Sequence, residues 1–265
     1  MNKNVLVTGA ASGIGSAVCD IFLKKGHRVY GIDLGKIAAR DRLCTMCADI
    51  TDESALNKIK DRLDSDGVTL DLIINVAGIH AMTSLVEGDT GKMKRVIDVN
   101  LCGTVLVNRT FHPLLSPDGR IVIVTSEVAS FDPMPFNGLY NVSKTALECY
   151  AQALRQELNL LGQRVISIRP GAVETPLSSG SVNATARLAE STVLYKKQAG
   201  RFCTIANRFM GKPMKPEKLA ELIYRAAMKK RPRPVYKKHQ SVGLILLNLL
   251  PLRWQCAIIK LILNR

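Results

Sequence analysis

A short apolar strand that runs directly into a glycine-rich turn sets the first constraint on the fold of this chain. Residues 4–8 read Asn-Val-Leu-Val-Thr, too few for a core helix. Residues 9–15 follow as Gly-Ala-Ala-Ser-Gly-Ile-Gly, and an apolar-periodic segment then predicts a helix to about Lys25, where Gly26 stops it. Glycines let backbone approach a pyrophosphate, and a helix N-terminus offers unpaired N–H groups. The turn therefore predicts a dinucleotide-phosphate site, and its lack of Gly-Lys-Ser/Thr excludes a mononucleotide P-loop.

The second expected strand, residues 28–33, ends in the carboxylate of Asp33. An acid about twenty residues after such a turn can accept hydrogen bonds from the adenosine ribose hydroxyls. The same charge would repel a 2′-phosphate, and neither Ser12 nor Leu34 supplies a positive charge to attract one. These residues favour NAD over NADP. The alternative is that Asp33 is a plain turn residue.

Strands and helices are expected to alternate along most of the chain, whose 265 residues suit one α/β domain with a sizeable core. Further strands are expected at about 44–48, 70–76, 119–125 and 164–169. Helices are expected at about 52–63, 90–114, 140–161, 187–209 and 216–229. This order predicts a single-domain, Rossmann-type, doubly wound parallel sheet with helices on both faces. We expect this domain to span residues 1–238, with a substrate lid at about 176–212, and residues 239–265 to form an apolar helical extension.

The helix expected over residues 140–161 begins with Tyr140-Asn-Val-Ser-Lys144. Residues four apart share one helix face, so the phenol and the ammonium would point into the same space. Lowering the pKa of a phenol by ~2–3 units requires roughly 3–4 kcal/mol of phenolate stabilisation, which a neighbouring cation can supply. The alternative is an ordinary amphipathic helix with a packed Tyr140 and a solvated Lys144.

Three more segments carry polar or small residues where a site would need them. Residues 75–78, Asn-Val-Ala-Gly, follow a buried strand and would permit close approach of a flat ligand. Ser126 stands at the end of the fifth expected strand. Asn100 lies within the expected helix 90–114, where it is either an exposed polar residue or the holder of a water at a kink.

These features in this order resemble the NAD(P)-dependent short-chain dehydrogenases/reductases. The resemblance covers roughly residues 3–176 and continues to about 236. The spacing Thr8-Gly9-x-x-x-Gly13-x-Gly15 is similar to the compact branch of that family, not to the extended branch of sugar-nucleotide epimerases. The resemblance implies an NAD-preferring oxidoreductase of the same fold.

The resemblance also implies four catalytic residues. Tyr140 would be the general acid/base that exchanges a proton with the substrate oxygen. Lys144 would lower the pKa of Tyr140 and bind the nicotinamide ribose. Ser126 would hydrogen-bond the substrate oxygen, and Asn100 would hold the water of a proton relay that runs through Lys144.

Two departures from the family pattern stand out. Ser126 and Tyr140 are fourteen positions apart, one more than is usual, so Thr125 and Ser130 are alternatives for the serine role. Residues 75–78 contain one asparagine where the family more often has two, and we expect little consequence.

The cofactor-binding residues implied by the resemblance come from every strand end along the predicted site. Those expected near the pyrophosphate are Gly9, Ser12, Gly13, Ile14 and Gly15. Those expected near the adenosine are Asp33, Asp49 and Ile50. Those expected near the nicotinamide and its ribose are Asn75, Ala77, Gly78, Tyr140, Lys144, Pro170, Gly171, Val173 and Thr175, the last of these at the carboxamide.

Cysteine usage and the N-terminus indicate a reducing compartment. The seven cysteines are scattered and do not resemble a secreted disulfide framework. Cys44 and Cys47 form a Cys-x-x-Cys pair without a second pair at zinc-ligand spacing, so we expect ordinary strand residues and no metal. Residues 1–4 lead at once into a strand without a signal-peptide pattern, which predicts a cytoplasmic protein.

The net charge of +15 includes a basic run, residues 229–238, just before an apolar tail, residues 242–263. With 5% aromatic residues and no recognisable module, the charge does not indicate nucleic-acid binding. Pro251, Arg253 and Lys260 interrupt the tail too often for a spanning helix and favour two short surface helices. These helices could cover a hydrophobic pocket, join two subunits or make peripheral contact with a membrane through residues 231–265.

The expected substrate is a lipophilic, steroid-like secondary alcohol or its ketone, because similar tails occur in family members that handle steroids and retinoids. Apolar residues before the catalytic helix and in the lid would line its pocket, unless they only pack the lid: Phe131, Met134, Phe136, Leu194, Phe202, Ile205, Phe209 and Met210. Two alternatives remain, a small polar or acyl substrate and a scaffold that senses NAD without turnover. The resemblance suggests a homodimer or a homotetramer, although the tail could block one usual interface.

Overall fold

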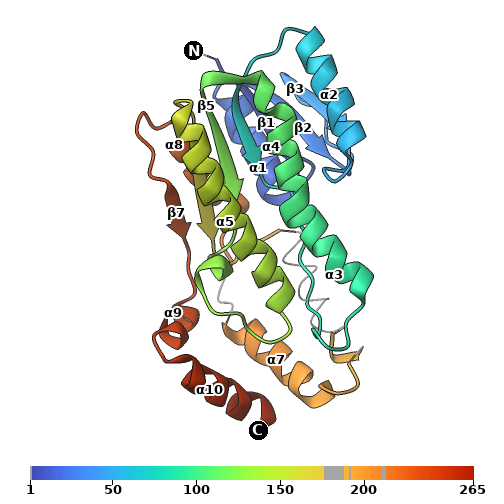
Figure 1. Ribbon diagram of the computed structural model, residues 1–265, viewed down its shortest axis with the longest axis vertical. Coiled ribbons are helices and arrows are strands. Elements are labelled where there is room, and N and C mark those ends of the chain that lie inside the picture. The colour runs from blue at the N-terminus through green and yellow to red at the C-terminus, as the bar shows by residue number, and fades with distance from the viewer. Residues whose placement is uncertain (1, 176–187, 191, 210–212) are drawn as a thin grey trace.

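The computed structural model describes residues 2–175, 188–190, 192–209 and 213–265 (Figure 1). Its centre is a seven-stranded sheet of order β3-β2-β1-β4-β5-β6-β7, in which every neighbouring pair is parallel. The strands are β1 (Asn4–Thr8), β2 (Arg28–Asp33), β3 (Leu43–Cys47), β4 (Leu70–Asn75), β5 (Leu115–Val124), β6 (Arg164–Pro170) and β7 (Val235–Lys238). The sheet confirms the predicted doubly wound, single-domain fold.

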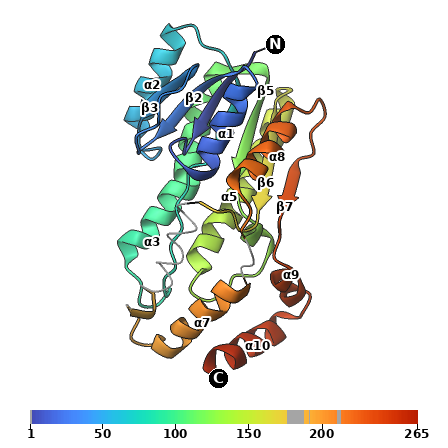
Figure 2. The same cartoon turned by 180° about the vertical axis from the view of Figure 1, so that it is seen from behind.

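Helices cover both faces of the sheet (Figures 1 and 2). One face is covered by α1 (Gly13–Lys24) and α8 (Pro216–Met228), the other by α2 (Glu53–Ser65), α4 (Thr104–Phe111) and α5 (Gly138–Leu160). An apolar core lies on each face of the sheet, and successive strand residues point into the two cores alternately. Val5 and Val7 of β1 pack under α1, whereas Leu6 packs on the opposite side. Burial on both faces explains why the strands read as continuous apolar runs.

The long helical segment predicted over residues 90–114 is a series of consecutive helices of three types, α, π and 3₁₀. It runs through α3 (Thr90–Ile97), the π-helix η1 (Asp98–Gly103), α4 and the 3₁₀ turn η2 (His112–Leu114). The π-turn interrupts the regular hydrogen bonding, and such bulges are frequent at functional sites. Asn100, for which a place at a kink was one of two expectations, lies inside this π-turn.

The elements differ from the prediction in three places. The helix expected from about residue 187 is not continuous, because residues 192–195 are not helical and α7 (Lys196–Phe209) begins after them. β5 begins at Leu115 instead of Gly119, because the chain enters the strand straight after η2. The short strand β7 was not predicted. It has four residues, two of them exposed lysines, and pairs on one side only, so it carries no apolar alternation that could have revealed it.

The C-terminal segment folds as a pair of helices, α9 (Val242–Asn248) and α10 (Leu252–Asn264), at the end of the molecule farthest from the N-terminus (Figures 1 and 2). α10 packs against α7 (Lys196–Phe209). Two short helices are therefore present, as the broken apolar pattern predicts. Among the described helices, none has both the length and the apolarity needed to cross a bilayer.

Candidate active site

A cleft of about 260 Å³ opens at the carboxyl ends of β1, β2, β3 and β4. Eleven residues that the sequence predicted for the cofactor line it: Gly9, Ser12, Gly13, Ile14, Gly15, Asp33, Asp49, Ile50, Ala77, Gly78 and Thr175. Seven further residues line it without having been predicted: Ile32, Leu34, Ala48, Val76, Ile79, Arg95 and Val99. The cleft lies where ligands bind in open parallel sheets.

The glycine turn at this cleft is fixed by steric limits. Gly9 and Gly13 have φ angles of +71° and +51°, which residues with a Cβ rarely adopt. A Cβ on Gly15 would lie 1.9 Å from the backbone oxygen of Gly9, so only glycine lets α1 start this close to the turn. The N-cap residue Ser12 makes no side-chain capping bond, so its hydroxyl does not occupy the N–H groups of the first turn. This cradle fits a pyrophosphate.

The Asp33 carboxylate is held by two backbone donors. Its oxygens accept hydrogen bonds from the N–H groups of Ala11 at 2.9 Å and of Gly35 at 2.8 Å. The carboxylate therefore fixes the glycine turn and the end of β2 together while it lines the cleft.

Arg95 of α3 is a cleft residue that sequence reasoning missed. Its Nη2 lies 2.6 Å from Oδ2 of Asp49, and its Nη1 donates to the Thr51 hydroxyl at 3.0 Å. Burial raises the pKa of Asp49, but hydrogen bonds from Thr51 and Arg95 outweigh burial and hold that pKa below its ordinary value. The separation of 46 positions between Arg95 and Asp49 left no local signal in the sequence.

Tyr140 and Ser126 meet beside this cleft. The phenol, in the first turn of α5, is hydrogen-bonded to the Ser126 side chain at the end of β5. The two alternatives for the serine role are engaged elsewhere. Thr125 donates to Glu148 and to Ile168, and Ser130 accepts from Arg169. The structure thus brings together Tyr140 and the serine favoured by the sequence.

Lys144 lies one turn farther along α5 and is buried. Its Nζ is 5.8 Å from the centre of the Tyr140 ring and 3.4 Å from the carbonyl oxygen of Val124. A Cβ on Gly78 would lie 3.5 Å from the same Nζ, so the ammonium sits directly behind the cleft wall. The shared helix face predicted for residues 140 and 144 is therefore present.

The pKa values of this pair correct one expectation. Burial raises the pKa of Tyr140 to about 12, against a smaller lowering by the Ser126 hydrogen bond, and burial lowers the pKa of Lys144 to about 8. Glu127 adds to the rise at Tyr140. In the protein alone, desolvation therefore outweighs the lowering of the Tyr140 pKa that the sequence led us to expect from Lys144.

Asn100 is fully buried, so the alternative of an exposed polar residue is wrong. Its side chain accepts from the N–H of Ile79 at 2.8 Å, and its amide donates to the Ile79 carbonyl and to the Ser143 hydroxyl. The π-turn thus ties the wall of the cleft to α5. The role of Asn100 in holding a relay water stays a prediction.

His80 is a second residue at the site that the sequence analysis missed. Its ring packs edge-on against Tyr140, with centroids 4.5 Å apart, and its Nε2 lies 2.9 Å from Oδ1 of Asn137. Burial lowers the pKa of His80, and the Lys144 charge lowers it further. The sequence did offer one indication of its role, because His80 stands two positions after the small residues 75–78 that were expected to border the site.

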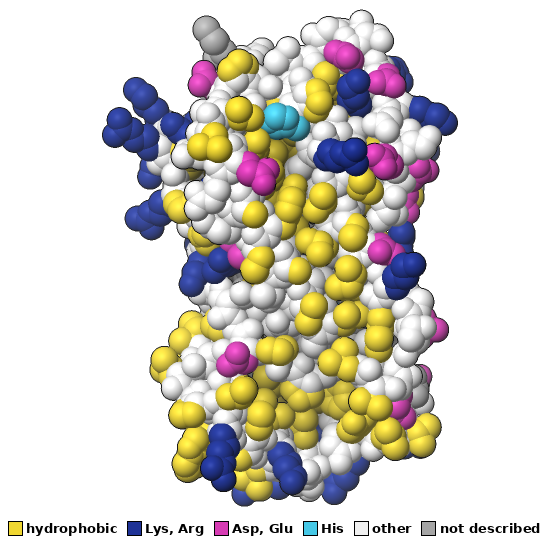
Figure 3. Space-filling view, viewed as in Figure 1, with side chains coloured by type: hydrophobic (Ala, Val, Ile, Leu, Met, Phe, Trp, Pro, Cys, Tyr) yellow, Lys and Arg dark blue, Asp and Glu magenta, His cyan; other side chains and the backbone are white. Residues whose placement is uncertain are grey.

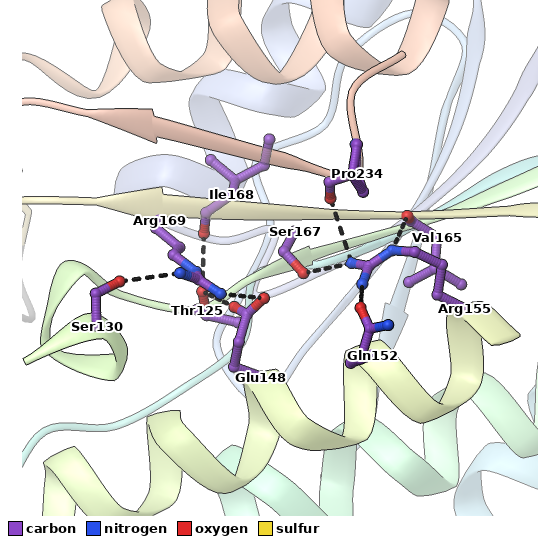
Figure 4. A network of polar contacts seen from close by, with 10 residues as sticks. All are labelled: Thr125, Ser130, Glu148, Gln152, Arg155, Val165, Ser167, Ile168, Arg169 and Pro234. Atoms are coloured by element: carbon purple, nitrogen blue, oxygen red, sulfur yellow. Dashed lines mark hydrogen bonds and ion pairs between the residues drawn. The ribbon is translucent and has the colours of Figure 1, made fainter. Parts of the chain in front are cut away.

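A polar network fastens α5 to β5 and β6 (Figure 4). Glu148, one turn after Lys144, lies 2.8 Å from Nη2 of Arg169, and both side chains are mostly buried. Burial raises the pKa of Glu148, but the Arg169 ion pair and hydrogen bond hold it below its ordinary value. Farther along α5, Arg155 donates to the Val165 carbonyl and the Ser167 hydroxyl of β6. These bonds set the position of the helix that carries Tyr140 and Lys144.

Six predicted cofactor residues do not line the cleft: Tyr140 and Lys144, which lie beside it, and Asn75, Pro170, Gly171 and Val173. Asn75 is buried and donates to Asn108, while its own Oδ1 has no hydrogen-bond partner among the described residues. Val173 is buried and pairs with Met214. Gly171 donates to the Lys238 carbonyl, next to Pro170 at the end of β6. Their roles toward a cofactor stay predictions.

The expected substrate pocket is described in part. Phe136 and Phe202 pack edge to face at 5.5 Å in an apolar cluster with Leu188, Ala199 and Leu263, and Met134 and Ile205 pack against it. Leu194 is exposed, and Phe131 is partly buried. The side chain of Phe209 and all of Met210 lie outside the described residues. In the described parts of the chain, no disulfide joins any of the seven cysteines, and no group of three His, Cys, Asp or Glu is placed to hold a metal.

Comparisons with known proteins agree with this site. A family model described as short chain dehydrogenase matches residues 3–186. An uncharacterised oxidoreductase of Staphylococcus saprophyticus is 30% identical over 189 residues, which cover 67% of this chain and 81% of that protein. A protein of Schizosaccharomyces pombe named NADPH-dependent 1-acyldihydroxyacetone phosphate reductase is 33% identical over 203 residues, 73% of this chain and 68% of that protein. A crystal structure of a short chain dehydrogenase family protein from Francisella tularensis shares the fold, with a TM-score of 0.76, 24% identity, and coverage of 89% of this chain and 97% of that one.

Proposed function

Because the chain belongs to the short chain dehydrogenase family, which consists of oxidoreductases, we propose that it interconverts a secondary alcohol and a ketone with NAD. The observation that carries the proposal is the pair formed by Tyr140 and Ser126, with Lys144 one turn below, directly beside the glycine-lined cleft. Bound NAD would accept or supply the hydride, which leaves the protein to orient the substrate and move the proton.

The cleft residues fit such a cofactor. The turn at Gly9–Gly15 would hold the pyrophosphate, Asp33 the adenosine ribose, and Asp49 with Ile50 the adenine. Ala77, Gly78 and Thr175 would border the nicotinamide half, where Gly78 leaves the space between the cleft and Lys144 open.

Tyr140 would transfer the proton. Its raised pKa keeps the phenol protonated at neutral pH, which suits donation to a ketone oxygen. In the opposite direction the phenol oxygen would accept the alcohol proton, and the Lys144 ammonium would stabilise the phenolate. Ser126 would orient the substrate oxygen, and Asn100 would connect Lys144 to a relay water.

The charges around the cleft favour NAD over NADP. Asp33 would repel a 2′-phosphate, and Arg95, the cationic residue among those described as lining the cleft, is paired with Asp49. The fission-yeast relative is named as NADPH-dependent, so the cofactor preference has to be measured on this chain.

A lipophilic substrate is supported by the apolar cluster around Phe136 and Phe202 near the catalytic end of α5. From this cluster we propose a bulky lipophilic alcohol or ketone, steroid-like in its apolar surface, ahead of a small polar or acyl substrate. The name of the fission-yeast relative describes an acylated ketone, which belongs to the second of these classes.

The deciding experiment is a panel of hydroxysteroids, retinol and aliphatic alcohols with NAD, followed as NADH absorbance, with NADP as the comparison. We expect turnover with a lipophilic secondary alcohol and a higher kcat/KM for NAD than for NADP. NAD binding without turnover of any alcohol or ketone in the panel would instead support a nucleotide-sensing scaffold. An Asp33→Ala variant with unchanged cofactor preference would contradict the role given to this carboxylate.

A further inference from the structure

The two C-terminal helices expose an unusual amount of apolar side chain. The residues that form this tail surface are Val242, Leu246, Leu249, Leu252, Trp254 and Leu261. Leu249 is 74% exposed and Trp254 is 63% exposed. Contiguous apolar patches on a protein surface mark interaction sites, whereas single exposed apolar residues are ordinary.

Helix α10 carries apolar residues on two different faces, one packed against the protein and one exposed. Along α10, Gln255, Ile259 and Leu263 recur every four residues and face the protein, where Leu263 joins the cluster around Phe136. Trp254 and Leu261 lie seven residues apart on a different, exposed face of the same helix. α10 is therefore apolar on the inside and also along part of its outside, so a second apolar medium can be accommodated while it stays packed on α7.

Cations surround the tail surface. Residues 229–265 contain nine Lys or Arg residues and no Asp or Glu. Arg253 and Lys260 lie on α10 among the exposed apolar residues, and Lys237 and Lys238 are exposed on β7 just before the tail. Figure 3 shows apolar and Lys or Arg side chains side by side at this end of the molecule. A surface of this composition is complementary to an apolar layer beneath negatively charged headgroups.

We propose that the tail surface docks on an anionic lipid bilayer, with α9 and α10 lying in the plane of the interface. The helices are too short to span a bilayer, at 7 and 13 residues, and their apolar side chains need only reach the headgroup–acyl boundary. A second copy of the chain fits less well. In a two-fold interface the same patch meets itself, so Arg253 and Lys260 would face like charges.

The tail surface is tied to the segment that follows Ser126. The Ser241 N–H donates to the partly buried Glu127 carboxylate at 2.6 Å. The Asp132 N–H donates to Asn248 at 2.7 Å, and Gln255 donates to the Asp132 carboxylate at 2.9 Å. Docking would therefore bring the catalytic end of the cleft close to the lipid. A docked protein could then take a lipophilic substrate directly from the bilayer, and this part of the inference rests on the proposed function.

The chain contains one tryptophan, Trp254, which provides a direct probe of docking. The intact protein is mixed with vesicles of phosphatidylcholine alone or with one-third phosphatidylserine, and binding is followed by flotation and by Trp254 emission. We expect binding to the phosphatidylserine vesicles, a blue shift of the emission, quenching by brominated acyl chains, and at least about tenfold weaker binding in high salt than in low salt.

Two variants test the apolar and the cationic parts separately. Leu246→Ser/Leu249→Ser should weaken vesicle binding at least about tenfold because it removes two exposed leucines. Its matched control, Leu160→Ser/Leu161→Ser, removes two exposed leucines at the end of α5 and should leave binding unchanged.

Arg253→Gln/Lys260→Gln should weaken binding to anionic vesicles by about tenfold or more. The exposed pair Lys58→Gln/Arg62→Gln on α2 is its control and should bind as the unaltered protein does.

Absence of binding to anionic vesicles, with unshifted Trp254 emission, would overturn the proposal. So would a dimer, measured by light scattering, that Leu246→Ser/Leu249→Ser dissociates while no vesicle binds. Because binding is measured without substrate, docking without any turnover of the alcohol panel would refute the proposed function alone. Turnover of a soluble alcohol without docking would refute this inference alone.

Discussion

The glycine turn and the C-terminal helices lie at different ends of the same molecule and are held in place by different forces. At the turn, the backbone of α1 packs directly against the backbone of Gly9, whose carbonyl group occupies the position that a Cβ on Gly15 would need. At the tail, three hydrogen bonds join residues 114 to 123 positions apart, and apolar side chains remain outside. The turn is therefore intolerant of added atoms. The tail is sensitive to lost polar partners and adaptable on its outer side.

The largest effect should follow from adding one methyl group at the turn. In Gly15→Ala the new Cβ would lie 1.9 Å from the Gly9 oxygen and 2.6 Å from its carbonyl carbon, so the turn or α1 must shift. We expect a loss of about 3 kcal/mol in the free energy of unfolding, measured in urea, together with loss of NAD binding. Gly200→Ala in α7 is the control. Its added Cβ would have no described atom within 4 Å, so the variant should stabilise the protein by up to about 1 kcal/mol through the higher helix propensity of alanine.

Tyr140→Phe tests the chemistry beside the turn without disturbing its shape. We expect activity to fall at least ~100-fold, the scale of a lost general acid/base, while the dissociation constant of NAD stays nearly unchanged. Tyr150→Phe is a matched control, because it removes another phenol of α5, one that accepts a hydrogen bond from Asn108 of α4. Full activity in Tyr140→Phe, or an equal loss in Tyr150→Phe, would refute the assignment.

The contrast between the two regions also explains what the sequence could predict. The turn, the strand ends and the pairing of Tyr140 with Lys144 follow from local spacing, so residues close in sequence were enough to place them. Arg95 beside Asp49 and Gln255 beside Asp132 depend on tertiary packing, which leaves no periodic pattern. The raised pKa of Tyr140 depends on desolvation of the phenol by the surrounding fold, which a spacing of four residues does not report.

Lys144 is buried, and its burial should appear in the pH dependence of stability. Its pKa is about 8 in the folded protein and near 10.5 in the unfolded chain, so between these values the unfolded state binds more protons. Stability should therefore rise from pH 8 to pH 10, by roughly 2–3 kcal/mol at about 1.36 kcal/mol per pKa unit. Above pH 10 the raised pKa of Tyr140 acts in the opposite direction, because the unfolded phenol then loses its proton first.

The measurement is urea unfolding of the unaltered protein and of Lys144→Met from pH 7 to pH 10. The variant lacks the buried ammonium, so its stability should exceed that of the unaltered protein most at pH 7, and the difference should shrink as the pH rises. Parallel stability curves would contradict the burial of a titrating lysine at this position.

The smallest of these effects should come from the tail. Gln255 is buried, and its amide donates both to Asp132 and to the Leu250 carbonyl, so Gln255→Met removes two hydrogen bonds at similar side-chain volume. We expect a loss of about 1–2 kcal/mol and faster hydrogen exchange in α10 and in residues 127–132, with the glycine turn unaffected. Gln152→Met, an exposed glutamine on α5, should change neither. Exchange that rises equally at the turn would mean that the two regions unfold as one unit and that the tail is not an independently adaptable element. Exchange confined to the tail would mean that α9 and α10 can adjust on an apolar surface while the cofactor cleft keeps its shape.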